Sequence, residues 1–321
     1  GYGLQRHVNG GATVRAIDAL VAMTGNIGKK GGGARYGHLM TWGFNYHAMI
    51  HSAPKGSKGY LGEAAKGEFD FTKDEEGPSY SNRTLNINKT ARELINASDP
   101  PVRMLWSSCK NPVSQDFDRN LMQKAFDKLE MVVSVEQFFT QTVEQSDIVL
   151  PVTTLFEEWT VNVSYWHYWM SINEQSVKPL HEARSNIEIA SALSKKLNEL
   201  KPGSCTFPED IDTKEWMTKE FNKGIYDLFG INSWEDLKKG TAKAKNYLVP
   251  WADGKFGTPS KKYEFKSDLC AEHGFNALPK YVESRKPYDK LRLLTPHTKF
   301  GIHSQFVNID WMEEFNGKPY V

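Results

Sequence analysis

The 321-residue sequence lacks the marks of several common protein classes. Its three cysteines lie far apart and form no CxxC pair and no spacing typical of zinc or iron–sulfur sites. Lysine and arginine total 40 against 39 for aspartate and glutamate, so nothing indicates binding to nucleic acid or to an anionic membrane. No apolar run reaches the roughly 18 residues that a spanning helix needs, so we expect no direct insertion into a membrane. Both ends of the sequence look cut, which predicts a piece of a longer protein.

The most informative stretch runs from Met131 to Glu158. A run of apolar, mostly β-branched residues at 131–135 predicts a strand, and Glu136 stands where that strand would end. A segment of helical composition, 142–146, leads to a second apolar run that stops at Pro151. Strands with unbroken hydrophobicity are buried on both faces, as in a parallel sheet. Because such sheets bind ligands beyond the carboxyl ends of their strands, Glu136 is expected at the functional edge.

The surrounding pattern predicts an α/β fold. A strand at 102–106, the loop SSCKNPVSQD and a helix at 117–129 with Asp116 as its N-cap precede the two strands above. We therefore expect one half of a doubly wound, mainly parallel sheet flanked by helices. Glu136 would occupy the place of the ribose-binding acid of a dinucleotide fold. The first turn reads SSCKNP rather than GxGxxG, which disfavours an NAD dehydrogenase.

The rest of the chain gives weaker patterns. The stretch 159–170 holds five aromatic residues and a histidine, which favours buried packing over a role in lining a substrate channel. Further predicted elements are a helix with Val14, Ile17, Leu20 and Val21 on one face and ended by Gly25, a loop excursion at 52–86, a helix at 89–97, a capping box Ser185–Glu188 opening a helix to about Leu197, helices around 213–229 and 234–239 with the second capped by Ser233, a turn and strand within 256–266, and a strand at 291–294.

Several blocks, taken in order, resemble the molybdopterin oxidoreductases of the DMSO reductase family. These blocks are GxxLQRxxNGG, TGNIGKKGGG, the KNP loop, VEQFFTQTVEQSDIVLP with the following FEE, and LLTPHTKFGIHSQF. The resemblance implies three parts: an α/β dinucleotide-binding-like domain at 1–158, a helical and connecting α+β region at 159–288, and the truncated start of a cofactor-capping domain at 289–321.

The resemblance also implies a cofactor. The family binds two molybdopterin guanine dinucleotides (bis-MGD) around one Mo or W ion. The metal's protein ligand, and any 4Fe-4S cluster, would come from a segment upstream of this chain. The chain alone is therefore expected to be inactive, to supply no catalytic residue or metal ligand, and to bind cofactor weakly or not at all. In an intact enzyme the expected partners are a small-molecule substrate and an iron–sulfur electron-transfer subunit.

Two sets of residues are candidates for binding this cofactor. Glu136 could accept both hydroxyls of a guanosine ribose, and Thr140 could reach the same nucleotide. The hydroxyl of Ser108 and the loop around Asn111 could hold phosphate or ribose oxygens. The non-functional alternatives are that Glu136 is a solvated loop acid and that Thr140 and Asn111 only form turns. Cys109 is expected to be a small packed residue rather than a metal ligand.

The second set comes from the two ends of the chain. The resemblance places Gln5, Arg6 and His7 near a pterin, together with His297, His303, Ser304 and Gln305 from the capping domain. Two histidines without a third ligand make a metal site the weaker interpretation. A second hypothesis also stays open, in which the chain is a self-contained nucleotide-binding or interaction module without catalytic function.

Overall fold

A computed structural model describes residues 3–4, 7, 9–34, 36, 87–98, 101–163, 167–221, 223–245, 249–283 and 299–317. The elements in chain order are α1 (Gly10–Met23), η4 (Ile87–Lys89), α3 (Thr90–Asn96), β1 (Met104–Ser108), α4 (Pro112–Gln115), α5 (Arg119–Phe126), β2 (Met131–Glu136), η5 (Val143–Gln145), β3 (Ile148–Pro151), β4 (Thr160–Val163), β5 (Trp169–Asn173), α6 (Asn186–Leu200), α7 (Thr213–Glu220), α8 (Lys223–Phe229), η6 (Trp234–Lys239), β6 (Ala242–Lys243), α9 (Asp268–Glu272) and α10 (Asp310–Asn316). The predicted loop at 52–86 and the predicted strand at 291–294 lie outside the described residues.

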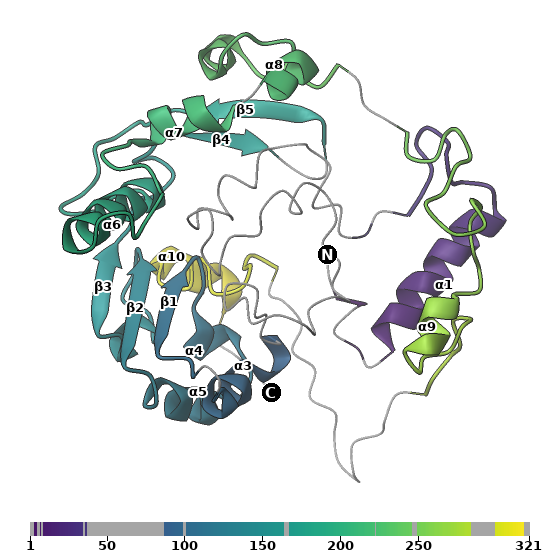
Figure 1. Ribbon diagram of the computed structural model, residues 1–321, viewed down its shortest axis with the longest axis horizontal. Coiled ribbons are helices and arrows are strands. Elements are labelled where there is room, and N and C mark those ends of the chain that lie inside the picture. The colour runs from purple at the N-terminus through teal and green to yellow at the C-terminus, as the bar shows by residue number, and fades with distance from the viewer. Residues whose placement is uncertain are drawn as a thin grey trace.

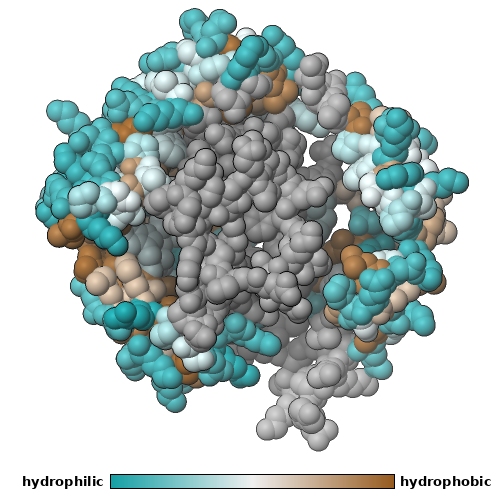
Figure 2. All heavy atoms as spheres, viewed as in Figure 1, coloured by the Kyte–Doolittle hydropathy of each residue, from teal (hydrophilic) through white to brown (hydrophobic). Residues whose placement is uncertain are grey.

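A parallel three-stranded sheet in the order β1-β2-β3 carries the predicted α/β unit (Figure 1). The central strand, β2, is buried along Val132–Val135, as its unbroken apolar run predicts. The edge strand, β3, departs from the prediction, because Ile148 and Val149 are exposed instead of buried on both faces. Figure 2 shows apolar side chains gathered over this edge. The mixed α/β class is confirmed, while the doubly wound arrangement stays a prediction.

Helices α3 and α5 pack against each other and against the sheet, with Met122 fully buried between them. The predicted helix at 117–129 is shorter, and its N-cap is Asp118 instead of Asp116. Asp118 adopts φ +60° and accepts a hydrogen bond from the Leu121 amide at 3.1 Å, which satisfies an otherwise unpaired amide of the first turn. Asp116 ends the unpredicted helix α4. Phe117, expected on the packed face, precedes α5 and is 63% exposed.

An antiparallel sheet, β4-β5-β6, forms a second core with α7, α8 and η6. Trp159 and Tyr168 from the aromatic stretch pack on this core around the fully buried Met170, as predicted, although Trp169 is exposed and residues 164–166 lie outside the described part. The predicted helix at 213–229 is two helices that break at Phe221. The 234–239 element is a 3-10 helix, and the predicted cap, Ser233, makes no side-chain capping bond.

Helix α1 ends as its sequence predicts. Gly25 has φ +64°, its amide bonds the Ala22 carbonyl, and the Asn26 amide bonds the Val21 carbonyl. This pair of bonds is a Schellman motif, and it requires the left-handed conformation that glycine adopts most easily. The apolar face of α1 is only half-covered, since Leu20 is exposed.

Helix α1 lies beside α9, away from the parallel sheet (Figure 1). Arg15 joins α1 to the segment that follows α9 by donating from its guanidinium to the backbone carbonyls of Asn276 and Ala277, at 3.1 and 2.5 Å. The predicted strand within 256–266 is wrong: Lys261 turns the chain with φ +57°, and the aromatic residues pack on one another, with Tyr263 against Phe265 at 4.9 Å between ring centroids. No described helix is long and apolar enough to cross a membrane.

Candidate nucleotide-binding edge of the parallel sheet

The carboxyl ends of β1 and β2 bring two predicted residues to one edge. Ser108 ends β1 and is in register with Val135, and the next residue, Glu136, ends β2 opposite Pro151. The half-buried Glu136 accepts a hydrogen bond at Oε1 from the Gln137 amide, 2.7 Å away. That bond uses one carboxylate oxygen. No bond to Oε2 is recorded among the described residues, so the second oxygen is the one available to a ligand.

The loop after β1 is held by its own side chains. The Ser107 hydroxyl donates to the Lys110 carbonyl at 2.7 Å, and Cys109 adopts φ +56° between them. Cys109 is exposed, so its prediction as a small packed residue is wrong. Ser108 donates its hydroxyl hydrogen to Asn186 Oδ1 at 2.8 Å, at the start of α6. The Ser108 oxygen can still accept a hydrogen bond from a ligand.

Asn111 lies at the same edge but points inward. Its side chain is buried, and Oδ1 accepts a 2.5 Å hydrogen bond from the buried Thr142 hydroxyl, whose oxygen in turn accepts from the Val113 amide at 3.2 Å. The Asn111 backbone amide donates to Gln115 Oε1 at 3.0 Å. This network joins α4 to η5 and leaves Asn111 mainly a positioning role.

Thr140 starts the turn that leads into η5. Its Oγ1 accepts from the Val143 amide at 3.3 Å, and its carbonyl accepts from the Glu144 amide at 2.9 Å. The hydroxyl hydrogen of this half-buried residue remains for donation to a ligand. Thr140 therefore both shapes the loop after Glu136 and keeps one polar hydrogen near that edge.

One residue of the C-terminal motif reaches the same edge. Gln115, whose Oε1 holds the Asn111 amide, donates through Nε2 to the Ser304 hydroxyl at 3.2 Å. His303 and Gln305 flank Ser304 and are exposed, with φ +53° at His303. Of the remaining predicted pterin contacts, Gln5, Arg6 and His297 lie outside the described residues, and His7 is exposed just before α1.

Sequence reasoning missed Gln115, Thr142 and Asn186. The spacing of four from Asn111 to Gln115 was a usable signal, since residues four apart on a helical turn can meet. Asn186 carried none, because its contact with Ser108 spans 78 positions and arises only from the fold.

Two acids, Glu157 and Glu158, follow the carboxyl end of β3 in the sequence. Glu157 is buried and accepts hydrogen bonds from the Thr154 amide and hydroxyl, both 2.8 Å, and from the Leu180 amide at 2.7 Å. These bonds, led by the Thr154 amide, lower the pKa of Glu157. Burial raises the pKa of Glu158, which accepts a bond from the Thr153 hydroxyl at 2.9 Å and faces the charges of Glu188 and Glu157.

The donor set at the edge fits a sugar better than a phosphate. A ribose diol donates to a carboxylate and accepts from hydroxyls, which matches Glu136 Oε2 and Thr140. The nearby cation, Lys110, is engaged by Asp116 at 2.8 Å, so it offers little charge to a phosphate. The described residues contain no group of three His, Cys, Asp or Glu side chains able to hold a metal ion. The hydrogen-bonding groups at this edge therefore match a ribose diol better than a phosphate.

Comparison with known proteins decides the family. The molybdopterin oxidoreductase model matches residues 1–196, more than half of the chain. The chain belongs to the molybdopterin oxidoreductase family. Among its relatives is the probable oxidoreductase YyaE of Bacillus subtilis, 33% identical over 96% of this chain and 42% of its own length. This membership confirms the predicted resemblance to the DMSO reductase family.

Two further relatives carry names that state an activity. The trimethylamine-N-oxide reductase of Haemophilus influenzae is 24% identical over 98% of this chain and 42% of its own length. The dimethyl sulfoxide/trimethylamine N-oxide reductase of Cereibacter sphaeroides is 25% identical over 95% of this chain and 40% of its own length. The chain thus spans about two fifths of the length of these relatives. Family membership implies a molybdenum–molybdopterin cofactor.

Proposed function

We propose that this chain belongs to the catalytic subunit of an oxidoreductase carrying bis-MGD with Mo or W, and that the β1–β2 edge binds the guanosine end of one MGD. The observation that carries the proposal is the placement of Glu136 and Ser108 at the carboxyl ends of neighbouring parallel strands. When bound, the metal–pterin group would supply oxygen-atom transfer or the movement of electrons and protons.

The residues of this chain would bind and orient the cofactor. Glu136 Oε2 would accept a hydrogen bond from the ribose 2′-hydroxyl, and the carboxylate is held for this by the 2.7 Å bond from its own neighbour, Gln137. Ser108, fixed by Asn186, would accept a hydrogen bond from the 3′-hydroxyl, and the Thr140 hydroxyl would donate to the nucleotide. Because Gln115 bonds both Asn111 and Ser304, the C-terminal motif would lie over the same nucleotide.

Catalysis would depend on parts of an enzyme beyond these residues. The metal's protein ligand, any 4Fe-4S cluster and an iron–sulfur electron-transfer subunit would come from other parts of the enzyme. We expect the purified 321-residue chain to contain no stoichiometric Mo or W and to show no reductase activity. Metal analysis by mass spectrometry checks this, and one Mo or W per chain would overturn it.

The ribose contact can be tested with GDP, which carries the guanosine and pyrophosphate of MGD. Calorimetric titration of the chain should give weak binding, and Glu136→Ala should raise the Kd about tenfold or more, because a hydrogen bond to a charged group contributes about 1.5–3 kcal/mol. Removing the partner hydroxyl with 2′-deoxy-GDP should have a similar effect on the unchanged chain. In Glu136→Ala, GDP and 2′-deoxy-GDP should bind equally, since the two changes remove one shared interaction.

The matched control is Glu272→Ala, which removes an exposed acid of α9, away from the parallel sheet, and should leave the Kd for GDP unchanged. If loss of the 2′-hydroxyl weakens binding equally in the unchanged chain and in Glu136→Ala, the carboxylate does not hold the ribose. A self-contained nucleotide-binding module would pass this test too, and it differs from the oxidoreductase in needing no metal centre.

A further inference from the structure

The side chain of Gln137 continues the link between β2 and β3 where their backbone pairing ends. That pairing ends at Glu136, whose carbonyl accepts from the Val152 amide at 3.3 Å. One residue further on, Gln137 donates through Nε2 to the backbone carbonyl of Thr153 at 2.9 Å. Its own backbone amide holds Glu136 Oε1 at 2.7 Å. Gln137 therefore ties the proposed ribose acid to the segment that leaves β3.

Thr153 is a buried junction whose polar groups all have partners. Its amide donates to the Arg184 carbonyl at 3.2 Å, and its carbonyl accepts from Gln137. Its hydroxyl donates to Glu158 Oε2 at 2.9 Å. In a buried chain of hydrogen bonds each bond polarises the next, so a change at one member is felt by its neighbours. Such a chain joins Glu158 to the carboxylate of Glu136.

Glu158 is the far end of this chain, and its charge can change. It is half-buried, and the charged groups that face it are two other acids, Glu188 of α6 and the neighbouring Glu157. Burial is the largest cause of the raised pKa of Glu158; the bond from Thr153 lowers that pKa, and the two acids raise it further. From β5, the neutral Asn173 side chain bonds only the Glu158 carbonyl, at 3.0 Å. Glu158 therefore takes up a proton at a higher pH than an ordinary glutamate.

The charge of Glu158 decides how firmly Thr153 is held. A hydrogen bond to an ionised carboxylate is roughly twice as strong as one between neutral groups. With Glu158 charged, the Thr153 carbonyl is a fixed anchor for the Gln137 side chain. Once Glu158 is protonated, the Thr153 hydroxyl loses its strong acceptor and the anchor loosens.

We propose that Gln137 is the positioning residue of the ribose site, and that it makes the orientation of Glu136 depend on the charge of Glu158. The inference rests on the proposed nucleotide function and assigns Gln137 no contact with the ligand. Gln137 holds Glu136 Oε1 so that Oε2 faces the 2′-hydroxyl. The site therefore discriminates more strongly against a 2′-deoxy nucleotide at neutral pH than in mild acid.

The readout is the ratio of the Kd of 2′-deoxy-GDP to the Kd of GDP, measured by calorimetric titration of the 321-residue chain. Titration of the phosphates is common to both nucleotides, so the ratio reports the 2′-hydroxyl contact. In the unchanged chain at neutral pH we expect a ratio of about ten. Gln137→Met keeps the length of the exposed side chain but removes its donor, and should lower the ratio to about three or less. A purely structural glutamine would weaken both nucleotides equally and leave the ratio unchanged.

A second variant tests the link to Glu158. Glu158→Gln fixes the neutral form, so at neutral pH it should show the reduced ratio that the unchanged chain shows at about pH 5. Its ratio should also change less with pH than that of the unchanged chain. An equal fall with pH in both proteins would refute the proposal.

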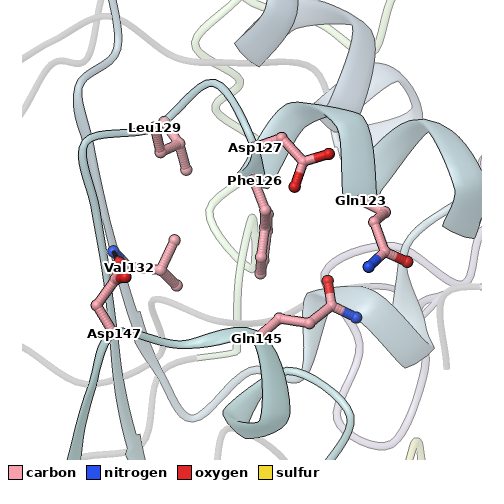
Figure 3. A pocket seen from close by; sticks show the side chains of 7 residues that line it. All are labelled: Gln123, Phe126, Asp127, Leu129, Val132, Gln145 and Asp147. Carbon is pink, nitrogen blue, oxygen red and sulfur yellow. Dashed lines mark hydrogen bonds between the residues drawn. The ribbon is translucent and has the colours of Figure 1, made fainter.

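The matched control is Gln123→Met, which makes the same exchange at the opposite edge of the sheet. Gln123 is an exposed residue of α5 and lines a hollow with Val132 and Asp147, at the amino ends of β2 and β3 (Figure 3). This variant should keep the ratio of the unchanged chain. Urea midpoints check that every variant is folded.

The outcomes separate this inference from the proposed function. If Glu136→Ala loses the discrimination and the folded Gln137→Met keeps it in full, the positioning role is wrong and the ribose contact stands. If the unchanged chain does not discriminate between the two nucleotides, both are wrong.

Discussion

Replacing Thr142 with valine should destabilise the edge that carries the nucleotide proposal. Valine has almost the same shape as threonine but has no hydroxyl. In the protein this hydroxyl is buried, donates to Asn111 Oδ1 at 2.5 Å and accepts from the Val113 amide at 3.2 Å. Thr142→Val would leave both partners buried and unpaired.

The magnitude follows from those two groups. Each unsatisfied buried partner costs about 1–3 kcal/mol, so we expect a loss of about 2–4 kcal/mol in the free energy of unfolding, allowing for partial relaxation. Thr142→Ser keeps the hydroxyl and removes only a buried methyl group, with an expected cost of about 0.5–1.5 kcal/mol. The difference between the two variants isolates the hydrogen bonds from the packing.

Urea unfolding monitored by far-UV circular dichroism measures both variants against the unchanged chain. Thr142→Val should lower the midpoint more than Thr142→Ser, at an unchanged slope with urea concentration. If Thr142→Val is no less stable than Thr142→Ser, the hydroxyl does not hold the loop, and the positioning role assigned to Asn111 fails with it.

Two more predictions concern the packing behind the edge. Ser185→Ala should cost about 1 kcal/mol of unfolding free energy, because the Ser185 hydroxyl caps α6 in a capping box. Ser233→Ala, the control, should cost little, because the Ser233 side chain makes no capping bond. The urea midpoints of the two variants compare these costs. Hydrogen bonds from Thr154 and the Leu180 amide lower the folded-state pKa of Glu157. Its stabilisation is therefore present above the ordinary glutamate pKa and lost as pH falls through the lower folded value. Glu157→Gln should flatten the acid limb of a plot of stability against pH, and an unchanged limb would contradict the assignment.

Local patterns predicted the elements whose signals are short-range. The apolar run of β2 and the acid that follows it are contiguous in sequence, and so are the Ser185–Glu188 capping box and the Gly25 helix stop. In each case the residues that decide the structure lie within about one helical turn or one strand of each other. Sequence alone was sufficient there because backbone preference and capping chemistry act over that distance.

The missed features depend on partners that are distant in sequence. Whether β3 is central or at an edge depends on which strands flank it, and its apolar run reads the same in both cases. The 256–266 stretch has strand-like composition, yet its rings pack on one another and no described strand pairs with it. The predicted N-cap, Asp116, instead ends α4, and α5 is capped by Asp118, whose backbone turn depends on how α4 and α5 meet.

The bonds of Gln115 link the two halves of the proposed nucleotide site. Its amide group bonds the Asn111 backbone on one side and the Ser304 hydroxyl on the other, across 189 positions of sequence. Any ligand that orders the loop around Asn111 would then reduce the entropy lost when the Ser304 segment docks. Thermodynamic linkage makes the effect mutual, so docking of that segment would strengthen nucleotide binding by the same factor. A single glutamine thus couples the loop around Asn111 to the segment around Ser304.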